Sequence, residues 1–181
     1  MELSKIMLEK FSNDDILKEY VLAKTLRYNN RSHLQEESVA EHSFFVALFS
    51  LKIIQQLKLP EELELRVLRL AVLHDCAEAV TSDIPHNVKK QFPNFDHFLK
   101  AVEEKYYTSN WKYYIEKLDD DLAYAIVKLA DNYSVLQFCL NEQQLGNKSP
   151  DIMEIYVNAS QRVEQSLEKV NQLLKEAKYI D

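Results

Sequence analysis

The chain has 181 residues, of which 46% are hydrophobic and 28% are charged, and it contains a single glycine. This length and balance predict one globular domain over residues 1–181, and the scarcity of glycine disfavours both hairpin-rich sheets and glycine-rich phosphate loops. The net charge of -7 disfavours a polynucleotide partner, because an acidic surface repels the nucleic-acid backbone. We therefore expect an all-α domain.

Two features of the sequence bear on cellular location. Charges occur within residues 1–5, where a signal peptide would have an apolar run, and no apolar stretch approaches the roughly 18–20 residues that span a membrane. Cys76 and Cys139 lie in apolar helical patterns without CxxC spacing, which favours reduced thiols that fill the core. We expect a cytoplasmic protein with no membrane partner.

Helix-starting and helix-ending residues recur along the chain. Serine and aspartate at capping positions, proline at first helical positions and Gly146 as a stop define the predicted boundaries. In chain order, the predicted helices cover residues 12–21, 38–57, 60–75, 85–90, 93–107, 122–145 and 149–178. The pattern predicts a bundle of about six or seven helices.

Two stretches depart from this regular pattern. Residues 81–85, Thr-Ser-Asp-Ile-Pro, interrupt it before the short fourth helix. The aromatic-rich residues 106–114 fit either a helix or a loop, and their composition is more typical of a core or a dimer surface than of a base-stacking platform. The last helix is the most polar one, so we expect it to cover the core from outside.

Three polar sites interrupt apolar helical faces: His42, the pair His74 and Asp75, and Asp131. Histidine and aspartate together suit a borderline-to-hard divalent cation such as Mn, Fe, Co, Ni or Zn. Adjacent residues diverge by about 100° around a helix, so His74 and Asp75 can share an ion only if it lies over the helix end. Glu78 is expected on the same helix face as this pair, where it could accept a proton from a metal-bound water.

Each of these residues also has a purely structural explanation. A histidine in an apolar helix is more often a hydrogen-bonded core residue than a ligand, and a His-Asp pair arises often by chance. Asp131 could be paired with Lys128 or Arg27, and Arg27 could form a surface salt bridge with Glu36 or Glu37. The order His, His-Asp, Asp on separate apolar helices is what favours a metal site.

These residues make the chain resemble a known family, the HD-domain metal-dependent phosphohydrolases, which carry H…HD…D in this order on a helical bundle. The similarity is greatest to the bacterial 5′-deoxynucleotidase branch. The resembling segments are Arg-Tyr at 27–28, Ser-Val-Ala-Glu-His-Ser at 38–43, His-Asp-Cys-Ala-Glu at 74–78, Thr-Ser-Asp-Ile-Pro at 81–85 and onward to Lys89, and Lys-Leu-Ala-Asp at 128–131. They extend over most of the chain and, as a set, are specific.

The resemblance implies a metal centre. His42, His74, Asp75 and Asp131 match the family's ligands for a divalent metal ion, for which Co, Mn, Fe, Ni, Zn and Mg all remain candidates. A homodimer is implied by the resemblance alone.

The resemblance also implies catalytic and substrate-binding residues. Glu78 and Asp83 match acids near the scissile phosphate, and Arg27 matches an arginine that binds the phosphate. Tyr28 stands where relatives often have tryptophan beside the sugar and base, and Ser82 stands where they have glycine. Lys89 could add a second cation, although a solvated lysine is the more common situation.

The expected reaction is hydrolysis of the 5′-phosphate of a deoxyribonucleoside monophosphate, a small-molecule nucleotide substrate. One alternative is a triphosphohydrolase that acts on a dNTP or a nucleotide analogue with the same metal site. A second alternative is a non-catalytic nucleotide-binding protein that keeps the HD residues. The presence of Glu78 and Asp83 beside the expected ligands disfavours the second alternative, because a sensor needs no general base.

Overall fold

The computed structural model describes residues 18–111 and 120–180, apart from the side chains of residues 86, 87, 90 and 93. Within these residues it has no strand, and extended backbone pairs only at an isolated bridge between Leu26 and Ser38. The elements are η1 (Val21–Ala23), α3 (Val39–Leu57), α4 (Glu61–Leu73), α5 (Glu78–Thr81), α6 (His86–Gln91), α7 (Pro93–Asn110), α9 (Asp121–Gln144) and α10 (Pro150–Glu176). The predicted all-α fold is confirmed, and the first predicted helix lies largely outside the described residues.

Side-chain caps explain where the principal helices begin. The Ser38 hydroxyl accepts from the backbone N–H of Glu41, and the Glu41 carboxylate accepts from the backbone N–H of Ser38, a capping box that starts α3. Asp120 accepts from the N–H of Ala123 at the start of α9, and Ser149 caps α10 in the same way. The predicted starts of these helices are correct to within a residue.

The helix ends show where prediction was less exact. Gly146 has a φ of 97°, the left-handed conformation expected of the stop after α9. Helix α7 continues to Asn110, three residues beyond the predicted end at Tyr107, so the first half of the ambiguous aromatic stretch is helical. Residues 112–114 of that stretch lie outside the described residues.

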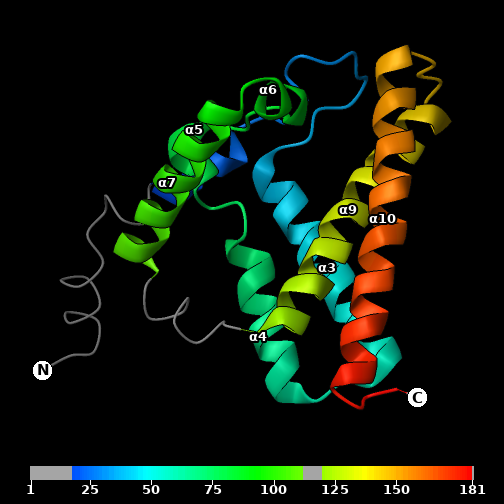
Figure 1. Ribbon diagram of the computed structural model, residues 1–181. Coiled ribbons are helices and arrows are strands. Elements are labelled where there is room, and N and C mark those ends of the chain that lie inside the picture. Colours follow the sequence, from blue (N-terminus) through cyan, green and yellow to red (C-terminus); the bar gives the residue numbers. More distant parts are fainter. Residues whose placement is uncertain (1–17, 112–119, 181) are drawn as a thin grey trace, which may run out of the picture.

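Helices α3, α4, α9 and α10 form the main bundle (Figure 1). Helix α10 lies along α9, and α3 packs against both α4 and α9. Their shared core consists of buried aliphatic side chains, including Val46, Ile54, Val67, Ala71, Ile126, Ala130, Val170 and Leu174. Helix α10 is amphipathic and covers one side of this core, as its polar composition predicts.

A smaller layer made of α5, α6 and α7 covers one end of the bundle (Figure 1). A second core cluster, which includes Leu22, Leu73 and Tyr106, joins this layer to the bundle. The Tyr107 hydroxyl donates to the backbone carbonyls of Leu73 and His74, at 2.7 and 2.6 Å. The chain leaving α4 is therefore fixed between the bundle and the covering layer. No described helix has the length and apolar character needed to cross a membrane.

Candidate metal centre and active site

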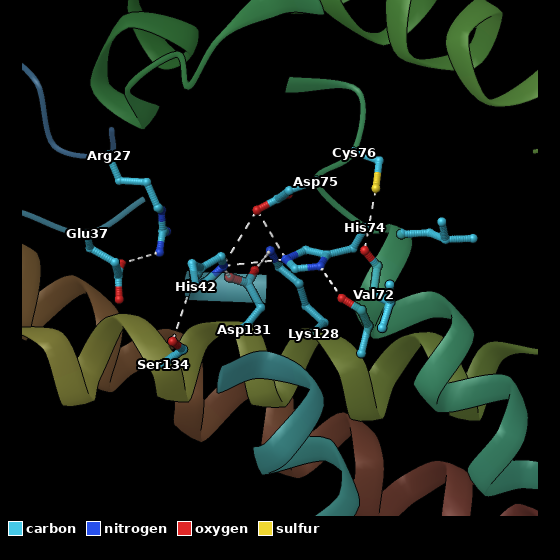
Figure 2. Close-up of polar contacts among 12 residues, drawn as sticks. Arg27, Glu37, His42, Val72, His74, Asp75, Cys76, Lys128, Asp131 and Ser134 are labelled. Carbon is cyan, nitrogen blue, oxygen red and sulfur yellow. Dashed lines mark hydrogen bonds and ion pairs between the residues drawn. The ribbon is translucent and has the colours of Figure 1, made fainter. Parts of the chain in front are cut away.

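Four side chains from three helical elements converge beneath the covering layer, as Figure 2 shows: His42 from α3, His74 and Asp75 from the end of α4, and Asp131 from α9. His42 Nε2 lies 3.2 Å from Asp131 Oδ1 and 3.4 Å from His74 Nε2. Asp75 Oδ2 lies 3.1 Å from His74 Nε2 and 3.5 Å from His42 Nε2. The structure thus brings all four predicted ligand residues to one point.

The arrangement leaves one side of this cluster open. The His42 side chain is 0% exposed, whereas those of His74, Asp75 and Asp131 are 16%, 25% and 17% exposed. Donor atoms of His42, His74 and Asp75 lie within 4.8 Å of one another, close enough to bind one metal ion. Asp131 is not part of this group of three, but its Oδ1 atom contacts His42 Nε2. Two nitrogen and two oxygen donors around a partly exposed point are the arrangement of a metal site that also admits a substrate.

Hydrogen bonds orient both imidazole rings toward the cluster. The Ala71 carbonyl lies 2.7 Å from His74 Nδ1 and can only accept, so Nδ1 carries the proton and donates. The Ser134 hydroxyl lies 3.2 Å from His42 Nδ1 and can accept in the same way (Figure 2). A ring that is neutral and protonated at Nδ1 directs the lone pair of Nε2 at the cluster, as metal-binding histidines require.

The electrostatics of the cluster favour a cation at its centre. Burial lowers the pKa of His74, but the Asp75 and Asp131 carboxylates outweigh burial and raise it to about 9. Burial and the nearby Arg27 charge lower the pKa of His42 to about 4. Burial opposes ionisation of both aspartates, yet the histidines hold the pKa of Asp75 and that of Asp131 below the usual range. Positive charge among the two carboxylates is thus favoured, and a divalent metal ion would supply it in place of the His74 proton.

The chain changes direction between His74 and Glu78. Helix α4 ends at Leu73, and Glu78 begins the separate short helix α5, so the prediction that Glu78 shares a helix face with His74 and Asp75 is wrong. The turn between the two helices explains how adjacent His74 and Asp75 side chains reach the same point. It also places Glu78 in the wall of the cavity above the cluster.

The Glu78 side chain is partly buried, and its Oε2 atom is buried without a hydrogen-bond partner among the described residues. Burial, and then the charges of Asp75 and Asp83, raise the pKa of Glu78 to about 9. Burial also raises the pKa of Asp83, although the Arg27 charge opposes this. At neutral pH, Glu78 therefore holds a proton, as a general acid must.

Arg27 lies at the cavity wall in a bend that follows η1. Its Nη1 atom donates to Glu37 Oε2 at 2.7 Å, and both side chains are only 12% exposed (Figure 2). The predicted alternative of an ion pair with Glu37 is therefore present, but the pair is largely buried near the cluster instead of lying on the surface. Burial lowers the pKa of Arg27, but Tyr28 and Glu37 outweigh burial and raise it, so the guanidinium keeps its charge.

Two backbone positions near the cavity have left-handed φ angles. Tyr28 has a φ of 60°, and its ring stacks on Phe138 with centroids 4.2 Å apart. Ser82 has a φ of 59° and a ψ of 170°, a conformation that glycine adopts far more easily than serine. This explains why glycine is suited to the Ser82 position in the resembling family.

A cavity of about 500 Å³ lies above the cluster and joins most of the predicted site. Its volume is within the range of small-molecule sites. The predicted residues that line it are Arg27, Tyr28, Asp75, Glu78, Asp83, Lys89 and Asp131. The remaining two predicted residues, His42 and His74, lie behind Asp75 and Asp131.

Sequence reasoning missed the part of the cavity wall that α10 provides. This wall consists of side chains one or three residues apart, which share one face of the helix: Glu154, Ile155, Asn158, Gln161, Arg162 and Gln165. The sequence predicts only that the last helix covers the core. The available signal was its polar residues at helical spacing, which alone did not distinguish a cavity wall from a solvated face.

The sequence and the fold are both similar to those of known phosphohydrolases. The family described as 5′-deoxynucleotidase YfbR-like matches residues 20–180 of this chain. A 5′-deoxynucleotidase of Yersinia pestis (strain Pestoides F) is 29% identical over 154 residues, which cover 75% of this chain and 73% of the relative.

Solved structures extend the similarity to the fold. An HD-domain phosphohydrolase of Listeria innocua has a TM-score of 0.71 and 25% identity, covering 90% of this chain and 85% of its own. The HD phosphohydrolase DatZ of cyanophage S-2L, solved with dA and one catalytic zinc ion, has a TM-score of 0.69 and 14% identity, covering 89% of this chain and 94% of its own. The predicted resemblance is confirmed, since the family match covers residues 20–180: this chain belongs to the YfbR-like 5′-deoxynucleotidase family of hydrolases.

Proposed function

We propose that the chain hydrolyses the 5′-phosphate ester of deoxyribonucleoside monophosphates with the help of one divalent metal ion. The observation that carries this proposal is the convergence of two histidines and two aspartates at the base of the cavity. The proposed ligands are His42, His74, Asp75 and Asp131. Family membership supports the reaction, and the cavity supports a small nucleotide as the substrate.

The donor set fits a divalent cation for two reasons on the protein side. The Nε2 atoms of His42 and His74 face the cluster because their Nδ1 atoms have hydrogen-bond partners. The cluster also stabilises one positive charge, which the His74 proton supplies in the absence of metal. When bound, a divalent ion supplies Lewis acidity toward a phosphoryl oxygen and a water molecule.

Glu78 and Asp83 are the proposed acid–base pair. The bond from phosphorus to the 5′-oxygen breaks while a bond from phosphorus to a water oxygen forms, so the leaving oxygen gains a proton and the water loses one. Glu78 holds a proton at neutral pH and is proposed to donate it to the leaving oxygen. Asp83, whose charge Arg27 stabilises, is proposed to take the proton from water.

Arg27 is proposed to bind the phosphate oxygens. Its pair with Glu37 fixes the guanidinium at the wall of the cavity, and its raised pKa keeps it charged. Tyr28 and Ile84 also line the cavity and are proposed to exclude a 2′-hydroxyl by packing against the sugar. Lys89, from α6, is a further cavity residue and the proposed second cation.

The cations of the cavity favour a monophosphate over a triphosphate. Arg27 is paired with Glu37, Lys128 lies 2.6 Å from Asp131, and Arg31 contacts both Asp151 and Glu154. A triphosphate needs several cations that are free to contact its oxygens. Since Arg31 and Lys128 are held by carboxylates, Arg27 and Lys89 are the cations proposed for the phosphate, and the triphosphohydrolase alternative has less support.

We also propose a cytoplasmic homodimer. Helix α3 exposes Phe44, Phe45 and Leu48, whose side chains are 59%, 44% and 38% accessible. The adjacent Tyr133 of α9 packs edge-on against Phe49 and is 38% exposed. Exposed apolar side chains grouped in this way are typical of a protein interface, and light scattering coupled to size-exclusion chromatography measures the expected dimer mass.

Phosphate release from a panel of nucleotides tests the proposed reaction. dAMP, AMP, dATP and 3′-dAMP are assayed side by side with Mn, Co and Mg. We expect dAMP to be cleaved much faster than AMP and 3′-dAMP to be stable. Faster turnover of dATP, with tripolyphosphate as the product, would overturn the monophosphatase proposal while leaving the metal site intact.

A further inference from the structure

Arg162 is the only arginine or lysine on the part of the cavity wall that α10 provides. Its Nε atom is buried and has no hydrogen-bond partner within the part of the chain that the structure describes. Leaving a buried donor unsatisfied destabilises a protein by about 1–3 kcal/mol, more when the group is charged. The position of Arg162 in a cavity wall indicates that a ligand supplies the missing acceptor.

The neighbours of Arg162 indicate what kind of acceptor this is. Asn158, Gln161 and Gln165 line the cavity at helical spacing around it, and all three are amides. A phosphate-binding wall would gather cations, whereas amides present donors and acceptors in the same plane, as base-pairing edges do. This wall is therefore suited to a nucleobase.

The register of α9 and α10 places the wall near the proposed metal centre. The Asn132 side chain donates to the Ser166 hydroxyl at 2.9 Å, and Asn132 follows Asp131 directly. Arg162 precedes Ser166 by four residues, which is about 6 Å along the helix. One cavity contains both Asp131 and Arg162, so a nucleotide with its phosphate at the cluster can extend its base toward α10.

A second unsatisfied atom belongs to a residue of the same cavity. The Tyr28 hydroxyl is buried without a partner among the described residues, and Tyr28 lines the same cavity. Its ring cannot move freely, because it stacks on Phe138 at an interplanar angle of 12°. Tyr28 thus forms a fixed surface in the same cavity as the phosphate-binding Arg27 and the α10 wall.

We propose, on the basis of the function proposed above, that Arg162 binds the edge of the nucleobase and makes the enzyme favour guanine over adenine. A guanidinium donates two hydrogen bonds to the O6 and N7 acceptors of guanine. Adenine presents one acceptor and one donor at the same positions, so it would leave a donor of Arg162 facing a donor of the base. The difference follows from donor geometry and does not depend on the metal.

The test compares kcat/KM for dGMP, dAMP and deoxyribose 5-phosphate, which has no base. Wild-type protein is measured beside Arg162→Met, which keeps an apolar stem but removes the donors, and Glu164→Gln, an exposed control on the same helix. We expect the wild type to prefer dGMP over dAMP by about tenfold. Arg162→Met should lose that preference through slower dGMP turnover, while deoxyribose 5-phosphate and metal content stay unchanged.

Binding of the product deoxynucleosides separates base recognition from the reaction. Calorimetry should give tighter binding of deoxyguanosine than of deoxyadenosine to the wild type, and equal binding to Arg162→Met. An equal loss of turnover on all three phosphate esters, or an unchanged preference in Arg162→Met, would overturn the inference. If the wild type cleaves no deoxynucleotide with any metal, the proposed function fails, and deoxyguanosine binding still decides the role of Arg162.

Discussion

The base and the walls of the cavity differ in how their polar groups are satisfied. At the base, His42, His74, Asp75 and Asp131 contact one another, and the Nδ1 atoms of both histidines have hydrogen-bond partners. In the walls, buried atoms of Tyr28, Glu78 and Arg162 lack a partner among the described residues.

This difference separates two kinds of task. A metal-binding cluster must hold its geometry before the metal arrives, and mutual contacts provide that. Groups that contact substrate must keep free donors and acceptors, and the protein tolerates the resulting loss of stability. The polar groups at the base of the cavity, which have partners, and those in its walls, which lack them, should therefore respond differently to substitution.

The largest expected effect on activity follows removal of a proposed metal ligand at the base of the cavity. Asp75→Ala should abolish metal binding and reduce turnover to background, because Asp75 contacts both histidines of the cluster. Metal content by mass spectrometry and phosphate release are measured on the same sample. Glu168→Ala, an exposed acid on α10, serves as the control and should keep both. Normal metal content in Asp75→Ala would remove this residue from the ligand set.

The next effect concerns the unpartnered acid of the wall. Glu78→Gln should lower kcat by about 10²–10⁴-fold with metal still bound, since general acid catalysis is worth about that much. The raised pKa of Glu78 also predicts that kcat of the wild type falls as pH rises, because the acid form is lost. This alkaline decline should be absent in Glu78→Gln. Full activity with normal metal content would transfer the role to Asp83.

A smaller effect is expected from the residue that orients His42. Ser134→Ala removes the hydroxyl beside His42 Nδ1 and should weaken metal affinity by about 10–100-fold. Excess metal should restore turnover, which a merely structural defect would not allow. Ser50→Ala is a matched control, because Ser50 is also fully buried but its hydroxyl has no partner among the described residues. Equal metal affinity in the two variants would contradict the role of Ser134.

Two carboxyl groups, one with hydrogen-bond partners and one without, can also be compared by their effects on the free energy of unfolding. The fully buried Glu142 accepts from the backbone N–H groups of Leu34 and Gln35 at 2.8 Å and from Asn147 at 2.6 Å. Glu142→Gln should lower the free energy of unfolding by about 2 kcal/mol, whereas Glu78→Gln should not lower it, because Glu78 is already neutral at pH 7. Urea unfolding of the metal-free proteins measures both.

The pH dependence of unfolding gives an independent check on Glu142. Burial raises its pKa, but the hydrogen bonds from Asn147, Leu34 and Gln35 lower it below the usual 4.5. Its contribution to stability is therefore present above pH 4.5 and is lost as pH falls through the lower folded-state pKa. The wild type and Glu142→Gln should converge in stability at acid pH. A difference that persists unchanged there would mean that Glu142 acts through packing alone.

The smallest expected effect is at Ser82, whose φ of 59° and ψ of 170° suit glycine. Ser82→Gly should raise the free energy of unfolding by about 1 kcal/mol, because relief of this backbone strain outweighs the greater flexibility of glycine when unfolded. Thermal unfolding is the measurement. A lower melting temperature would show that the Ser82 side chain stabilises the turn before Asp83.

The fold was predictable because its signals are local. Ser38, Asp120 and Gly146 act within one helical turn, so the sequence near each determines a boundary. The break after Leu73 was not predicted, since residues 74–78 carry neither proline nor glycine and the hydrogen bonds from Tyr107 come from a distant helix. Tertiary contacts of this kind have no signal in the local pattern.

The site was predictable to the extent that chemistry restricts residue type. Histidine and aspartate on apolar faces indicated the base of the cavity, since such groups are rarely buried without a role or a partner. Arg162 carried no such signal, because an arginine on a polar helix is ordinarily solvated. The Nε atom of Arg162 becomes buried only when α10 lies along α9.

The central claim is that His42, His74, Asp75 and Asp131 bind one metal ion at the base of the cavity. Anomalous diffraction from crystals grown with manganese or zinc tests it most directly, because it locates the metal independently of activity. The account predicts one strong peak roughly 2.0–2.3 Å from Nε2 of both histidines and from one oxygen of each aspartate. A peak elsewhere, or a peak bound by only one of these residues, would contradict it.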